Sequence, residues 1–193
     1  MTNSNLVEIT KIATNNNEQL VSDIAEISND FDAFYEKHKK WFDEDMEYED
    51  DIEDSILEIF VFWLERRGAD KNQFASHIDW KESPKEIIRQ LGEINKNLGY
   101  PLNINELEID ESEDTFEALK IINKHFSAKG FNLIGLDSGA DCYYLFIVPA
   151  KEFGRLQKLG GRLILIFLFL NNAPMKYFQS TQNCPAGGST NAA

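Results

Sequence analysis

The sequence FNLIGLDSGADCYYLFIVP, residues 131–149, contains the clearest strand pattern of the chain. Two β-rich runs, Phe131–Leu136 and Cys142–Val148, flank the turn Asp137–Asp141, which contains a glycine. Short apolar runs on either side of such a turn are typical of two antiparallel strands. We therefore predict a hairpin over residues 131–148, within a small and mostly antiparallel sheet.

Around this hairpin, several segments have the three-to-four-residue apolar spacing of helices. Asn17 is a candidate N-cap for the first of them, and Ser83-Pro84-Lys85-Glu86 is a capping box that opens the third. The predicted helices span residues 17–39, 49–67, 84–98, 115–129 and 151–159. The pattern predicts an α+β fold in which about five helices pack on the sheet. Residues 74–80 are a short strand or an extended connector.

The sequence changes character near its end. All 33 acidic residues lie at or before Glu152, and Lys176 is the single charged residue after Arg162. We predict one acidic α+β domain over residues 1–162. Residues 163–178 are either an apolar strand that completes the sheet or an atypical extension. Residues 179–193 are rich in Gly, Ser, Asn and Pro and are expected to be disordered.

Composition limits the classes of partner. The net charge of −14 argues against binding to nucleic acid or to an anionic membrane, since phosphate contacts need clustered Lys and Arg. It favours solubility or a basic partner. The longest uncharged apolar run, Leu163–Leu170, is too short to span a bilayer as a helix. Two cysteines without a metal or redox spacing, and no secretion signal, indicate the cytoplasm.

The strongest concentration of charge is the acidic run, residues 43–58, with ten acidic residues and no basic one. Aromatic residues lie at its start. Aromatic side chains are favoured as interface anchors, while charge steers the encounter with a partner. We predict a recognition surface, against the alternative of an ordinary solvated surface. Its residues are Trp41, Phe42, Asp43, Glu44, Asp45, Glu47, Tyr48, Asp50 and Asp51.

The hairpin turn offers a second candidate. Asp137, Ser138 and Asp141 are common turn formers, because their side chains bond to nearby backbone amides. The same groups could form a small polar site. Spacing motifs for metal ligands, nucleophiles, phosphate loops and dinucleotide binding are missing from the sequence, so we expect neither a metal nor another cofactor. His38 lies on the apolar stripe of a predicted helix, and we expect it to be a core or boundary residue.

Two segments carry a family resemblance, His77–Glu82 and Leu136–Tyr144. Over roughly residues 40–160 the chain resembles a bacterial domain family of unknown function that is catalogued by number. The resemblance implies a bacterial α+β domain, with no activity to transfer. In size and acidity the chain is also similar to the immunity proteins that bacteria carry against their own polymorphic toxins. That similarity implies a toxin-binding role.

These observations favour a non-enzymatic protein-binding module, an immunity or inhibitor protein whose acidic face binds a basic toxin or another basic protein. One alternative is a carboxylate-dependent enzyme with its site near the 137–141 turn. Another is a structural or regulatory subunit, in which Val61 and Phe62 form a contact between copies. The sequence leaves the oligomeric state open.

Overall fold

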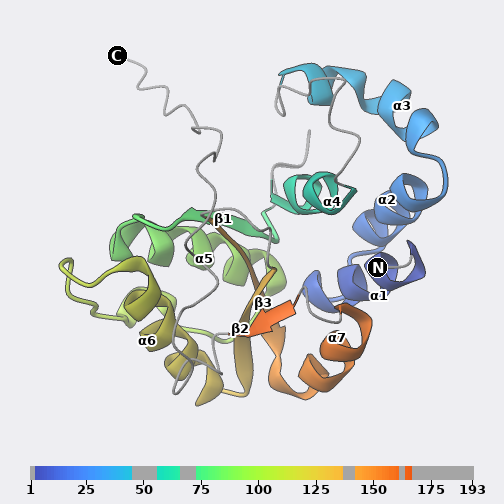
Figure 1. Cartoon of the computed structure of the whole chain (residues 1–193). Helices are drawn as coiled ribbons and strands as arrows, with labels where there is room; N and C mark the ends of the chain where they lie inside the picture. The colour runs from blue at the N-terminus through green and yellow to red at the C-terminus, as the bar shows by residue number, and fades with distance from the viewer. Residues whose placement is uncertain (1–2, 45–55, 66–72, 137–141, 161–163, 167–193) are drawn as a thin grey trace.

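The computed structural model describes residues 3–44, 56–65, 73–136, 142–160 and 164–166. The described part contains seven α-helices, two short 3-10 helices and four strands (Figure 1). The first elements are α1 (Asn3–Ala13), α2 (Glu18–Asn29), α3 (Phe31–Glu44), α4 (Ile56–Glu65), β1 (Ser76–Asp79) and α5 (Pro84–Leu98). The remaining ones are η1 (Ile104–Glu106), α6 (Thr115–Ser127), β2 (Phe131–Leu136), β3 (Cys142–Pro149), η2 (Ala150–Glu152), α7 (Phe153–Gly160) and β4 (Ile164–Ile166).

The sheet has the strand order β1-β3-β2-β4, and every pair is antiparallel. The predicted hairpin is confirmed as β2 and β3, which pair from Phe131 opposite Pro149 to Leu136 opposite Tyr144. The expected short strand within 74–80 is β1. Figure 1 shows α5 and α6 on one side of the sheet, with α1, α4 and α7 on the other. The α+β class is therefore confirmed.

Both faces of β3 are buried because helices cover both sides of the sheet. Leu145 and Ile147 lie on one face, while Tyr144 and Phe146 lie on the opposite face. The rings of Phe146 and Phe60 of α4 have centroids 6.3 Å apart, which places the even-numbered residues under α4. This two-sided burial explains why the strand is continuously hydrophobic instead of alternating with polar residues.

Side chains from the helices complete the hydrogen bonding of the sheet. Strand β4 pairs only with residues 134–136 of β2, and the neighbouring amide of Leu133 donates instead to Asn123 Oδ1 of α6 at 2.8 Å. On the opposite edge, the amide of His77 in β1 donates to Glu65 Oε1 of α4 at 3.0 Å. Each bond satisfies a backbone group that the strand pairing leaves unused.

Capping residues fix both ends of α5 and the start of α6. Ser83 caps α5 by accepting a hydrogen bond from the Glu86 amide at 3.3 Å, and Gly99 ends it with a φ of 67°. Asp114 caps α6 by accepting from the Glu117 amide at 2.8 Å. The capping box is only half formed, because the Ser83 amide donates to Glu82 Oε1 and not to Glu86.

The predicted helix over 17–39 is wrong in one respect, since it is two helices. Asn17 caps α2 as expected, but the backbone of Asp30 leaves the helical region with a φ of −151° and a ψ of 78°. The Asp30 carboxylate then accepts from the Ala33 amide at 3.1 Å, which starts α3. Asp is a good N-cap, and its capping bond competes with continuation of the helix. This break and the unpredicted α1 raise the helix count from about five to seven.

Helix α4 is central in the core. Val61 is 0% exposed and Phe62 is 9% exposed, so both sides of the helix are covered. This burial removes the exposed apolar surface that motivated the subunit alternative.

Within the described residues, no helix combines the length and the apolar character needed to cross a membrane. Residues 164–166 of the apolar segment form β4, while 167–193 lie outside the described residues.

Candidate acidic interface

The structure describes only the first part of the predicted recognition surface. Side chains are placed for Trp41, Phe42 and Asp43, and Glu44 is the last residue of α3. The remaining predicted residues of both candidate sites lie outside the described residues. They are Asp45, Glu47, Tyr48, Asp50, Asp51, Asp137, Ser138 and Asp141.

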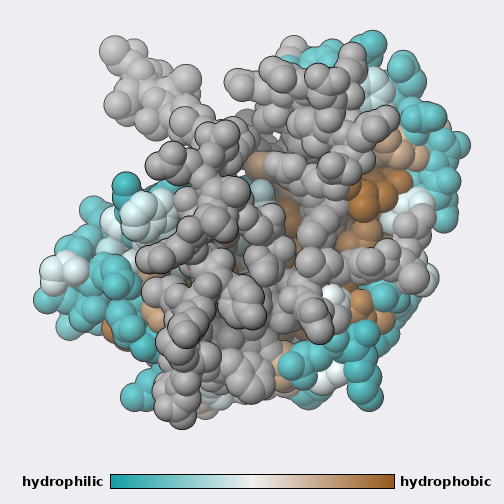
Figure 2. Space-filling model, viewed as in Figure 1, coloured by the Kyte–Doolittle hydropathy of each residue, from teal (hydrophilic) through white to brown (hydrophobic). Residues whose placement is uncertain are grey.

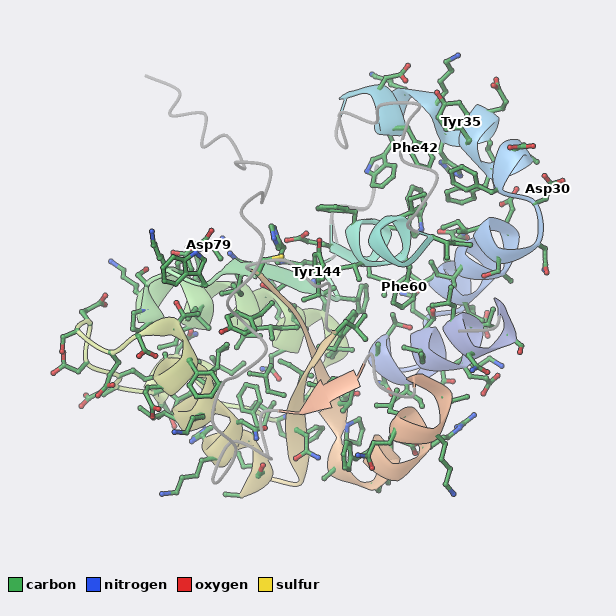
Figure 3. All side chains as sticks on the ribbon, viewed as in Figure 1. Asp30, Tyr35, Phe42, Phe60, Asp79 and Tyr144 are labelled. Atoms are coloured by element: carbon green, nitrogen blue, oxygen red, sulfur yellow. The ribbon has the colours of Figure 1, made fainter. Side chains whose placement is uncertain are left out.

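Trp41 and Phe42 are buried, which corrects the expectation that they are exposed anchors. Trp41 is 6% exposed and Phe42 is 0% exposed. Figure 3 shows Tyr35 and Phe42 on the side of α3 that faces α4. They belong to what we call the aromatic cluster, in which rings of α3 surround Trp63 of α4. Its members are Phe31, Phe34, Tyr35, His38, Trp41, Phe42 and Trp63.

The geometry of the cluster is mostly edge-to-face. Phe34 and Trp41 meet Trp63 at centroid distances of 4.8 and 4.9 Å, with interplanar angles of 78° and 82°. Aromatic pairs prefer such arrangements, which place a positive ring edge against a negative ring face. The cluster therefore fixes the C-terminal part of α3, and with it the start of the acidic run, against α4.

A buried carboxylate anchors the cluster to α2. Asp23 is 6% exposed, and its Oδ2 accepts a hydrogen bond from Trp63 Nε1 at 3.0 Å. Its Oδ1 accepts from Gln19 Nε2 at 2.7 Å. Both oxygens are thus bonded, as a buried carboxylate requires. Asp43, by contrast, is exposed at the end of α3.

A second acidic segment, not predicted as a site, lies entirely within the described residues. We call residues 106–114 the acidic loop. It contains six acidic residues and no basic one, and all six are exposed: Glu106, Glu108, Asp110, Glu111, Glu113 and Asp114. The signal was present in the sequence as six acids within nine positions, although the longer run at 43–58 overshadowed it.

Some of these carboxylates have structural roles. Asp110 accepts from the amide and the hydroxyl of Ser112 at 2.9 and 2.7 Å, and these bonds lower the pKa of Asp110. Asp114 caps α6, and Glu106 accepts from Asn103. These bonds hold the loop in shape. The side-chain carboxylates of Glu108, Glu111 and Glu113 have no ion pair or hydrogen bond among the described residues.

The acidic loop lies apart from the described start of the acidic run. In Figure 1 the loop lies beside α6 at the left edge, while α3 ends at the top of the view. Beside the loop, a groove of about 450 Å³ runs between α5 and η1, and Glu93 and Glu106 are among its lining residues. Figure 2 shows hydrophilic residues over the outer sides of α5, α6 and α3, and hydrophobic ones next to α2.

Other titratable groups are not gathered into a site. No three His, Cys, Asp or Glu side chains among the described residues are placed to hold a metal ion. His77 stacks on Tyr144 with a centroid distance of 5.1 Å, and His125 contacts Phe126 on α6. Cys142 is buried in β3.

The fold and its acidic segments define an α+β domain with helices on both sides of an antiparallel sheet. Residues 5–166 match the family described as Domain of unknown function (DUF6630), and the chain belongs to that family. The match confirms the resemblance to an uncharacterised family and extends it to α1 and β4. No curated protein and no solved structure shows a significant match to the chain.

Proposed function

We propose that this protein is a non-enzymatic protein-binding module of the bacterial cytoplasm whose acidic segments engage a basic protein. The observation that supports this role is the uncompensated charge of the acidic loop. Several carboxylates elsewhere on the described surface pair with neighbouring bases: Glu8 with Lys11, Glu26 with Lys37, Glu86 with Arg89, Glu93 with Lys96 and Glu117 with Lys120. Glu108, Glu111 and Glu113 are exposed without such a partner.

Uncompensated carboxylates favour a basic partner for a simple electrostatic reason. Neighbouring negative charges repel one another in the free protein, and Lys or Arg side chains of a partner would relieve that repulsion. Exposed charges of one sign also steer an oppositely charged protein toward the surface and raise the rate of association. Salt screens this attraction, so binding should weaken as ionic strength rises.

The partner that best fits this chemistry is a toxin that acts on nucleic acid. Such a protein must present Lys and Arg to phosphates, and a carboxylate-rich surface can occupy the same cationic groups. In this role the chain is an inhibitor or immunity protein, and it needs no catalytic group of its own. The start of the acidic run at the end of α3 and the acidic loop would serve as two separate contact regions, because they lie apart in the molecule.

Affinity capture from bacterial lysate tests the proposal. The bait is the full chain, compared with an acidic-loop variant (Glu108→Gln, Glu111→Gln, Glu113→Gln) and an acidic-run variant (Asp43→Ala, Asp45→Ala, Asp50→Ala, Asp51→Ala). A control variant (Glu18→Gln, Asp32→Asn, Glu36→Gln) removes three exposed acids from α2 and α3 and matches the charge change of the acidic-loop variant. Retained proteins are eluted with rising salt and identified by mass spectrometry.

We expect one stoichiometric basic protein that salt releases from the full chain. The control variant should retain it, while at least one of the two acidic-segment variants should lose it. Equal retention by all four baits, or elution that does not depend on salt, would contradict the proposal. The result also identifies which acidic segment makes the contact.

A further inference from the structure

His38 divides α3 into two helical parts. Its backbone, with a φ of −114° and a ψ of 19°, is not helical, although the residues on both sides are. The part after His38 carries Trp41 and Phe42 and leads into the acidic run. Any change at His38 therefore acts on the junction between the first part of α3 and the part that ends at Glu44.

The imidazole of His38 is packed between aromatic rings. Its centroid lies 4.4 Å from that of Phe34 and 4.8 Å from that of Trp63. Its Nε2 is buried and has no hydrogen-bond partner among the described residues. A neutral imidazole tolerates this environment, since one ring nitrogen carries no proton. A protonated ring must donate from both nitrogens, and a buried donor without an acceptor is unfavourable.

The charged groups near His38 do not compensate a positive ring. Burial lowers the pKa of His38 most strongly, and the adjacent Lys37 lowers it further; Asp23 and Glu26 of α2 act in the opposite direction. Both oxygens of Asp23 already accept hydrogen bonds, from Trp63 and Gln19. Glu26 is paired with Lys37 at 2.7 Å. Trp63, the ring contact from α4, carries no charge.

We propose that His38 is a pH-sensitive latch, whose neutral ring holds the end of α3 against α4 and whose protonation releases residues 39–44. Release would separate Trp41 from Trp63 and Phe42 from Phe34, and would expose two aromatic side chains beside the acidic run. The latch acts in the free protein, whether or not a basic partner binds.

The direction of the pH effect follows from the pKa. The folded-state pKa of His38 is lowered from the ordinary value of 6.5, so the packed state binds fewer protons than the released state. The packing is then fully stable above pH 6.5 and loses stability as the pH falls below that value. One proton is taken up on release, so the released population grows at most about tenfold per pH unit.

Hydrogen exchange of the full chain, measured from about pH 7.5 to about pH 5 and corrected for intrinsic exchange rates, tests the latch. We expect the amides of residues 39–44 to lose protection as the pH falls, while those of β3 and α5 keep theirs. His38→Phe retains an aromatic ring without titration and should give a flat response. The control His125→Leu removes a histidine outside the cluster and should respond like the original chain.

A protected 39–44 segment at low pH in the original chain would overturn the latch, as would an unchanged pH response in His38→Phe. If that variant does not fold, NMR titration of the His38 ring in the original chain decides the question. A ring pKa at or above the ordinary value of 6.5 would show that the packed state does not disfavour the protonated ring, and the proposal would fail.

Discussion

The aromatic cluster and the sheet are both apolar, but different interactions hold them. In the sheet, backbone pairing fixes the strands, and β3 bonds to neighbours on both edges. In the described part of the chain, aromatic side chains join α3 to α4, and the carboxylate of Asp23 bonds to the central Trp63. The difference indicates that the sheet should tolerate loss of one polar group better than the cluster does, because each strand keeps many other bonds.

The strongest perturbation should come at the boundary between the two regions. Phe146 of β3 is 1% exposed and contacts Phe60 of α4. Phe146→Ala should lower the free energy of unfolding by about 3–5 kcal/mol, since it leaves a cavity where the sheet meets α4. Chemical denaturation followed by both tryptophan fluorescence and circular dichroism measures the loss. Coincident transitions would show that the regions unfold together, whereas separate transitions would show that they are independent.

The bond between Asp23 and Trp63 tests the dependence of the cluster on one polar contact. Asp23→Ala leaves the buried indole N–H without an acceptor and should cost about 1–3 kcal/mol of stability. In Trp63→Phe, the same Asp23 substitution should cost less, because the donor is no longer there. A double-mutant cycle by urea denaturation gives the coupling energy. Additive costs would mean that the bond contributes nothing to the cluster.

Helix caps provide a comparison in which the two regions should behave alike. Asn17 caps α2, the helix that carries Asp23, and Ser83 caps α5, which packs on the sheet. Replacing either residue by Ala should cost about 1 kcal/mol, because each removes one acceptor from a helix N-terminus. Thermal unfolding monitored by circular dichroism is sufficient. Ser83→Asp is the control, since it keeps a capping oxygen and should retain most of the stability.

Gly92 gives the smallest expected effect, and it is stabilising. A Cβ at this position in α5 would lie 3.7 Å from Asn105 Oδ1, an ordinary contact distance. Gly92→Ala should therefore add about 0.5–1 kcal/mol to the free energy of unfolding, as alanine has less backbone freedom to lose in a helix. Gly99→Ala should destabilise instead, because that glycine has a φ of 67°. A loss of stability in Gly92→Ala would indicate a tighter contact with η1.

Local signals predicted the elements of the sheet region well. The hairpin and the Asn17 and Ser83 caps depend on residues within a few positions of one another, so the sequence alone shows them. The same reasoning extended one helix across Asp30, because the apolar stripe continues in register on both sides of the break. A residue with good capping chemistry inside a stripe can end a helix without interrupting its periodicity.

The candidate site was less predictable. Trp41 and Phe42 adjoin the acidic run. The high density of charge beside them predicted that they are exposed interface anchors. Trp41 packs against Trp63, which is more than twenty positions away and separated from it by that run, and Phe42 packs against Trp41. The exposure of the acidic loop, in contrast, could be inferred from its local composition, because carboxylates need no distant partner to stay in solvent.

The sequence by itself determined the α+β class, the hairpin, the helix ends and the acidic balance, since periodicity, turn chemistry and net charge are properties of neighbouring residues. The tertiary structure alone decided that α4 is enclosed, that Asp23 meets Trp63 across 40 positions and that His38 lies between two rings at a break in α3. These features follow from packing between distant segments, where burial changes what a polar or aromatic side chain can do.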